Sequence, residues 1–211
     1  MVEDLGKIIV NGFETYTRNL NLSFPFVLSV ILIYILGAIM FFIGFFYILK
    51  LPVSFLEKVQ NPENILSILQ MIGQNVLILA SMAIIYFIIV LFIQAFFAAG
   101  AIGMAKQATE AGKAELSVMV ETGKKSALNL YLAYFLLSLI YLAGVVFVVP
   151  GAMNFNPDDI SLKDNPGAGL LLFSGIAVWL LYIIILSIVL AVFEYSLVIE
   201  NYGPVDGMLE G

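Results

Sequence analysis

The sequence contains no cysteine and no histidine among its 211 residues. The lack of cysteine excludes disulfide bonds and thiolate nucleophiles, and the lack of histidine removes the commonest general base. Together these absences remove the usual ligands of zinc and of haem iron. Catalysis would have to rest on carboxylates, lysine, serine, threonine or tyrosine, and no enzyme motif connects them. The sequence therefore predicts a protein that is not an enzyme and that carries no cofactor and no metal.

Charged residues are also scarce, at 11% of the chain against 62% for hydrophobic residues. A soluble domain of this length could not bury so much apolar surface, so most of the chain must be surrounded by the lipid bilayer. The formal net charge of −6 argues against nucleic acid as a partner, because nucleic acid is bound by basic surfaces. This composition predicts an all-α fold, a polytopic transmembrane helical bundle.

Long apolar segments accompany this scarcity of charge. The longest run without charge, residues 64–105, has 42 residues, whereas about 20 suffice to cross a hydrocarbon core roughly 30 Å thick. Lys50 and Pro52 should end the first span, and Pro150-Gly151 should close the third. The four predicted spans are residues 24–49, 76–104, 128–149 and 170–199.

Residues 1–22 predict a helix that lies on the membrane surface, and they lack the cleavage site of a secretory signal. Apolar residues recur on one face and polar residues on the other, which is typical of an interfacial helix. Glu14 and Arg18 stand four residues apart in the favourable order for an ion pair. A second short helix is expected from Asn61 to Gly73, flat on the far face. The apolar face of the first helix comprises Leu5, Ile8, Ile9, Phe13, Tyr16 and Leu20.

The chain is interpreted as a single membrane domain with two hairpins. Residues 1–105 form the interfacial helix and the first hairpin, residues 106–127 a cytoplasmic linker broken at Gly112 and Gly123, and residues 128–199 the second hairpin. Six Lys and Arg residues lie before the first span or in the linker, against three on the opposite side. Because Lys and Arg are enriched in cytoplasmic loops, we expect a multi-pass protein of the cell membrane with both termini in the cytoplasm.

An internal repeat connects the halves. Residues 19–24 resemble residues 129–134, and each block stands where a polar helix enters a span. A third copy of the interfacial helix is expected to start in residues 200–211, so we expect the native chain to continue. The apolar residues of that segment repeat the spacing of Leu5, Ile8 and Ile9; they are Val205, Met208 and Leu209.

Several segments carry a resemblance to a known family. These segments are residues 12–20, residues 100–105, residues 123–125, residues 198–201 and residues 203–205. In them the chain resembles a family of uncharacterised archaeal integral membrane proteins, and more distantly the membrane domain of some bacterial glycerophosphodiester phosphodiesterases. The resemblance implies a helical membrane fold and one further hairpin, and it brings no catalytic residues to this chain.

Glu194 and Gln94 are the candidate functional side chains within the spans. Glu194 is the charge inside the fourth apolar stretch, and an ionisable residue at membrane depth marks a functional site unless it is paired. Snorkelling or an ion pair would explain it structurally, and the alternatives are a proton or cation relay and catalysis. The Gln94 side chain is expected to form a hydrogen bond between two helices. The candidate ion-pair partners of Glu194 are Arg18, Lys106, Lys124 and Lys125.

Small residues near the end of the second span predict close helix packing. Ala95, Ala99 and Gly103 stand at positions i, i+4 and i+8, a spacing that lets two helix backbones approach in lipid. The alternative is a lumen or substrate groove at the same patch. The acidic loop of residues 154–169 offers oxygen ligands, but their spacing matches no calcium-binding loop.

These observations favour a non-enzymatic scaffold or a subunit of a membrane complex. Its hairpins would pack against a second copy of the chain, as a homo-oligomer, or against other membrane subunits. The alternative is a permease or channel component that moves a small solute or ion, with Gln94 and Glu194 lining a polar path. Polar residues are not spread along one face of several spans, and this absence favours the scaffold.

Overall fold

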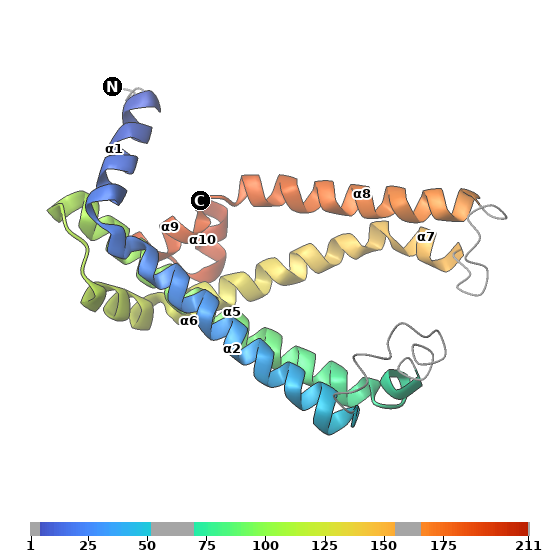
Figure 1. The fold of residues 1–211 in the computed structure, drawn as a ribbon. Coiled ribbons are helices and arrows are strands. Elements are labelled where there is room, and N and C mark those ends of the chain that lie inside the picture. The colour runs from blue at the N-terminus through green and yellow to red at the C-terminus, as the bar shows by residue number, and fades with distance from the viewer. Residues whose placement is uncertain (1–4, 52–69, 155–165, 211) are drawn as a thin grey trace. The chain divides into compact units, whose positions relative to one another are not determined.

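The computed structural model describes residues 5–51, 70–154 and 166–210 (Figure 1). Every regular element in these ranges is helical, which confirms the predicted all-α class. The chain divides into two compact units, Met1–Lys124 and Lys125–Gly211. Each unit is a membrane hairpin with a short helix or helices beside it.

The first unit begins with the predicted interfacial helix, α1. Its apolar side chains are exposed, and Arg18 forms the expected ion pair with Glu14 at 2.5 Å. Pro25 stands in the first turn of α2. Backbone N–H groups in that turn have no partner within the helix, so proline costs no hydrogen bond there. The elements of this unit are α1 (Leu5–Arg18), a 3₁₀ turn (Leu20–Ser23), α2 (Phe24–Phe42), a π-helical turn (Ile43–Ile48) and α5 (Val76–Ala111).

Helices α2 and α5 lie side by side and form the first hairpin (Figure 1). Glycines on α2 and its π-helical turn mark the contact, because a Cβ at Gly37 would lie 3.2 Å from the Tyr86 hydroxyl. About two turns further along the chain, a Cβ at Gly44 would meet Met82, four residues before Tyr86, at 3.7 Å. Lys50, with a left-handed φ of 51°, follows the last helical turn, as its predicted role in ending the span requires.

The linker predicted for residues 106–127 is mostly part of two long helices. α5 continues to Ala111, Gly112 adopts a left-handed φ of 74° after its C-terminus, and α6 (Leu116–Ala143) starts four residues later. The predicted break at Gly112 is therefore present. The predicted break at Gly123 is wrong: this glycine lies inside α6, where a Cβ would stand 2.9 Å from the Phe96 ring. It permits close packing of two helices and ends neither.

The second unit departs from its prediction in two places. The third span ends at Phe147, just before Pro150-Gly151, but these residues lie in the first turn of a further short helix, α7, where proline is tolerated. The fourth span is not one helix either, since a turn at residues 190–192 separates α8 from α9. Its elements are the rest of α6, a 3₁₀ turn (Gly144–Phe147), α7 (Val149–Asn154), α8 (Pro166–Val189), α9 (Phe193–Ile199) and α10 (Pro204–Glu210).

Four helical segments of the described residues are long and apolar enough to cross a membrane, so the chain is a multi-pass membrane protein. Each has 29 to 36 residues, whereas about 20 suffice. The acidic loop lies outside the described residues except at its ends, and so does most of the helix expected from Asn61. The described part of that helix, residues 70–74, ends one residue after the predicted stop at Gly73. The four segments are Leu20–Ile48, Val76–Ala111, Leu116–Phe147 and Gly167–Ile199.

Candidate functional site

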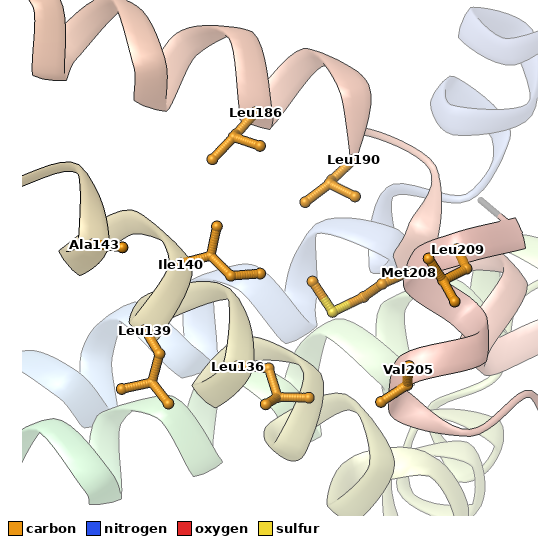
Figure 2. A pocket seen from close by; sticks show the side chains of 9 residues that line it. All are labelled: Leu136, Leu139, Ile140, Ala143, Leu186, Leu190, Val205, Met208 and Leu209. Atoms are coloured by element: carbon orange, nitrogen blue, oxygen red, sulfur yellow. The ribbon is translucent and has the colours of Figure 1, made fainter.

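The second unit contains an apolar cavity of about 550 Å³ between α6, α8 and α10 (Figure 2). On α6 the lining residues follow the i, i+3, i+4, i+7 spacing of one helix face. Among the described residues, no polar or charged side chain lines the cavity. The lining residues are Leu136, Leu139, Ile140 and Ala143 of α6, Leu186 and Leu190 of α8, and Val205, Met208 and Leu209 of α10.

Large aromatic residues hold α6 and α8 together at one end of the cavity. The Trp179 indole N–H donates to the Tyr141 carbonyl at 2.9 Å, and the Tyr182 hydroxyl donates to the Ile140 carbonyl at 3.0 Å. Both carbonyls belong to the last turn of α6, where helix carbonyls lack a regular partner. Gly144 lets the two rings approach, since a Cβ there would stand 2.6 Å from each. From this point the ribbons of α6 and α8 spread apart toward α10 (Figure 1).

Helix α10 forms the third wall of the cavity because α9 holds it in place. The Ser196 hydroxyl of α9 donates to the Gly207 carbonyl at 3.3 Å. Gly207 is buried, and a Cβ on it would lie 3.2 Å from Leu197. With that face of α10 on α9, the apolar stripe that begins at Val205 lies along the cavity (Figure 2).

Glu194 lies in the first turn of α9, beyond the turn that ends α8. Its carboxylate accepts a hydrogen bond from the Tyr134 hydroxyl of α6 at 2.9 Å, and the neighbouring Phe193 ring packs edge-on against Tyr134, 6.1 Å between centroids. Tyr134 is two residues before Leu136, about 200° around the helix, so this pair stands on another face of α6 than the cavity.

The sequence suggested an ion pair for Glu194, but its partner in the structure is the neutral hydroxyl of Tyr134. Among the described residues of the second unit, Lys125 is the only Lys or Arg. It forms no ion pair with Glu194. Arg18, Lys106 and Lys124 belong to the first unit. The tyrosine escaped the sequence analysis because it is 60 positions away from Glu194 in the chain.

The small residues of α5 lie in closely packed surroundings. Ala95 and Ala99 are fully buried, at 0% exposure. Gly103 lies directly against Thr122 of α6, whose hydroxyl and methyl groups occupy the space that a Cβ would take. Gln94, by contrast, is exposed. It lies in the first unit and Glu194 in the second, so within neither unit are the two polar candidates brought together.

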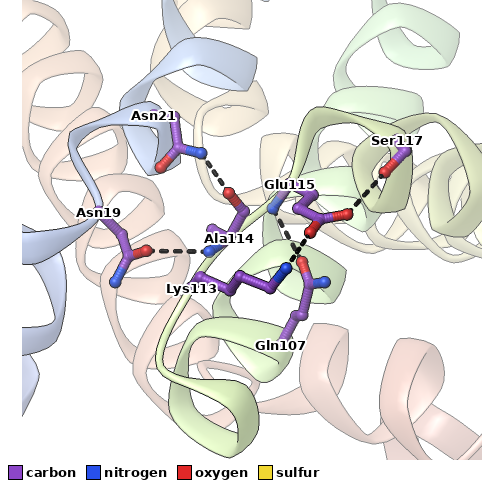
Figure 3. A network of polar contacts seen from close by, with 7 residues as sticks. All are labelled: Asn19, Asn21, Gln107, Lys113, Ala114, Glu115 and Ser117. Carbon is purple, nitrogen blue, oxygen red and sulfur yellow. Dashed lines mark hydrogen bonds and ion pairs between the residues drawn. The ribbon is translucent and has the colours of Figure 1, made fainter.

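A polar network in the first unit ties the segment between α1 and α2 to the turn between α5 and α6 (Figure 3). Asn19 is only 7% exposed, and its side-chain oxygen accepts from the Ala114 N–H at 2.9 Å. The Asn21 side-chain amide donates to the carbonyl of Ala114. The sequence analysis singled out these asparagines as part of a repeat and missed this role, because their partner is more than 90 residues away.

An ion pair lies beside this network, on the solvent side of the turn. Lys113 contacts Glu115 at 2.6 Å (Figure 3). The hydrogen bond and the charge of Lys113 lower the pKa of Glu115 below its usual value, and Glu115 raises the pKa of Lys113 in return. Gln107 accepts from the Glu115 N–H at 2.8 Å, which satisfies a free amide at the start of α6. Both charges are exposed, so the pair orders the turn rather than forming a site.

Comparison with family models, with curated proteins and with solved structures finds no match to this chain. Within the ranges that the structure describes, no three acidic residues gather as metal ligands would. The apolar cavity and the Tyr134–Glu194 pair are therefore the candidate functional features of the described chain.

Proposed function

We propose that this chain is a non-enzymatic scaffold or subunit of a membrane complex in the cell membrane, with both termini in the cytoplasm. The carrying observation is that serine, tryptophan and tyrosine side chains in the spans donate hydrogen bonds to the chain itself. Serine hydroxyls donate to carbonyls three or four residues earlier in their own helices. The hydroxyl protons are thus used within their own helices, which leaves no row of free serine donors in the described spans to line a polar path.

The remaining polar groups support the same proposal. Trp179 and Tyr182 bond to α6 carbonyls, and Glu194 is bound by Tyr134. Gln94 is exposed on the span surface, where its amide is suited to a hydrogen bond with a second copy or another membrane subunit. The resemblance to archaeal integral membrane proteins without catalytic residues agrees with a structural role.

Flux measurements test this proposal against the permease alternative. The purified chain is reconstituted in liposomes, and proton, sodium and potassium movement is compared with that of protein-free liposomes of the same lipid. We expect no difference under any of these gradients. A flux that is present with the wild type and lost with Glu194→Gln would overturn the scaffold proposal in favour of a relay.

The state of the assembly is tested on the same preparation. We expect light scattering in mild detergent to give a mass of more than one chain, or a stoichiometric second subunit. A monomer in detergent and in nanodiscs, combined with an ion flux, would contradict the proposal on both counts.

A further inference from the structure

We propose that the apolar cavity between α6, α8 and α10 holds one hydrocarbon chain of a membrane lipid whose headgroup carries no net charge. This inference goes beyond the proposed scaffold role and does not depend on it. It rests on the chemistry of the cavity walls, on its volume, and on the charges near it.

Water does not suit the cavity. A buried water needs two to four polar partners, and none of the nine lining residues offers a polar side chain. The cavity is open on its sides, since Val205 and Leu209 are 56% and 80% exposed, and its apolar walls would lose dispersion contacts if it stayed empty. The occupant must therefore be apolar.

The volume distinguishes between apolar occupants. A transmembrane helix about 10 Å across and 30 Å long displaces on the order of 2,000 Å³. The cavity, at about 550 Å³, is far too small for one. Its volume lies in the range of small-molecule sites, roughly 300–1,000 Å³. A single flexible chain fits such a space, and a helix of a second subunit does not.

The position of the cavity identifies the source of that chain. Its α6 and α8 walls belong to two of the membrane spans. The apolar molecules present at that depth are the hydrocarbon chains of lipids. The Trp179–Gly144 contact closes the end next to Ala143, so a chain that enters from the α10 end would extend toward this contact.

The charges near the α10 end determine the headgroup. Glu200 and Asp206 are exposed on the segment that carries α9 and α10. No Lys or Arg occurs anywhere from residue 164 to residue 211. An anionic headgroup would meet these carboxylates without a cation from α8, α9 or α10 to offset them, whereas a zwitterionic or neutral headgroup would not be repelled.

Native mass spectrometry of the full chain in mild detergent tests the proposal. The chain is given phosphatidylcholine or phosphatidylglycerol with identical hydrocarbon chains. We expect one phosphatidylcholine to be retained per chain, and less phosphatidylglycerol. Ala143→Phe, which fills the cavity, should weaken retention about tenfold or more. Ala177→Phe, the same change at an exposed position of α8, should leave retention as in the wild type.

The outcomes separate clearly. A wild type that retains no lipid, or an Ala143→Phe variant that retains as much as the wild type, overturns the proposal. Stronger retention of phosphatidylglycerol overturns the headgroup assignment. If Ala143→Phe does not fold, Val205→Phe on α10 fills the same space from the opposite wall. Failure of these tests leaves the flux and mass results for the scaffold role unaffected.

The single tryptophan provides a second measurement on the unchanged protein. Trp179 stands seven residues before Leu186, on the same face of α8 as the cavity wall. A phosphatidylcholine with a brominated chain should quench its fluorescence and saturate at one lipid per chain. Quenching that rises without saturation would indicate contact with bulk lipid only and would contradict the proposal.

Discussion

At the scale of single residues, the Tyr134–Glu194 hydrogen bond has a clear structural reason. A half-buried carboxylate loses part of its hydration, and one strong hydrogen bond offsets some of that loss. Phe193 packs on the same tyrosine, so the bond and the ring contact together hold α9 against α6. This arrangement explains an acidic residue in a span without a transport role.

We predict that Tyr134→Phe lowers the free energy of unfolding by about 1–3 kcal/mol, because it leaves the Glu194 carboxylate without its donor. Glu194→Gln keeps a hydrogen-bond acceptor and should cost less. The measurement is unfolding in detergent, followed by circular dichroism. Tyr47→Phe, at a tyrosine that is 80% exposed, is the matched control and should change little. Equal losses for Tyr134→Phe and Tyr47→Phe would refute the structural role of this bond.

At the scale of elements, glycines on α5 and α6 bring the two helices together. Gly100 and Gly103 on α5 face Met119 and Thr122 on α6, and Gly123 of α6 faces back toward α5. A Cβ at Gly100 would lie 2.6 Å from the Met119 side chain and 2.8 Å from its carbonyl oxygen. Backbones this close gain dispersion contacts that lipid cannot supply.

We predict that Gly103→Leu destabilises the first unit by roughly 1–3 kcal/mol through overpacking against Thr122. Threonine is β-branched and stiff, so it cannot move aside easily. Gly12→Leu on α1 is the control, because a Cβ there meets nothing within 4 Å and leucine favours the helix. Thermal melting in detergent provides the comparison. A Gly103→Leu variant that melts with the wild type would mean that this face of α5 is not packed.

At the scale of the whole molecule, four membrane crossings predict on which side of the membrane each connection between spans lies. An even number of spans returns the chain to the side on which it started. We therefore expect the turn between α5 and α6 on the same side as α1, and α7 on the opposite side. The excess of Lys and Arg near the turn and α1 favours the cytoplasm for that side.

This orientation predicts how introduced cysteines react, and each would be unique because the chain has none. Glu110→Cys, near the end of α5, should be protected from an impermeant thiol reagent in sealed cells and labelled after lysis. Met153→Cys, exposed at the end of α7, should be labelled from outside. Labelling of both from outside would contradict the four-span topology, and the reverse pattern would invert the assigned orientation.

Composition and charge-free runs determined the class of this protein and most of its span positions. A bilayer requires about 20 apolar residues for each crossing, and that requirement is local in sequence. For the same reason the Glu14–Arg18 pair and the turn at Gly112 could be predicted, since each depends on neighbours within a few residues. Local patterns also suggested the apolar stripe of α10, although its purpose was not visible.

Only the tertiary structure showed which contacts the residues of these sequence patterns make. Gly123 has the local signature of a helix break, but the approach of Phe96 makes it a packing position inside α6. The partner of Glu194 and the cavity walls come from segments far apart in the chain, so no spacing reveals them. In lipid the apolar pattern distinguishes a span from a loop but not one face of a span from another, because lipid and protein are equally apolar. Which faces meet therefore depends on shape and on a few hydrogen bonds.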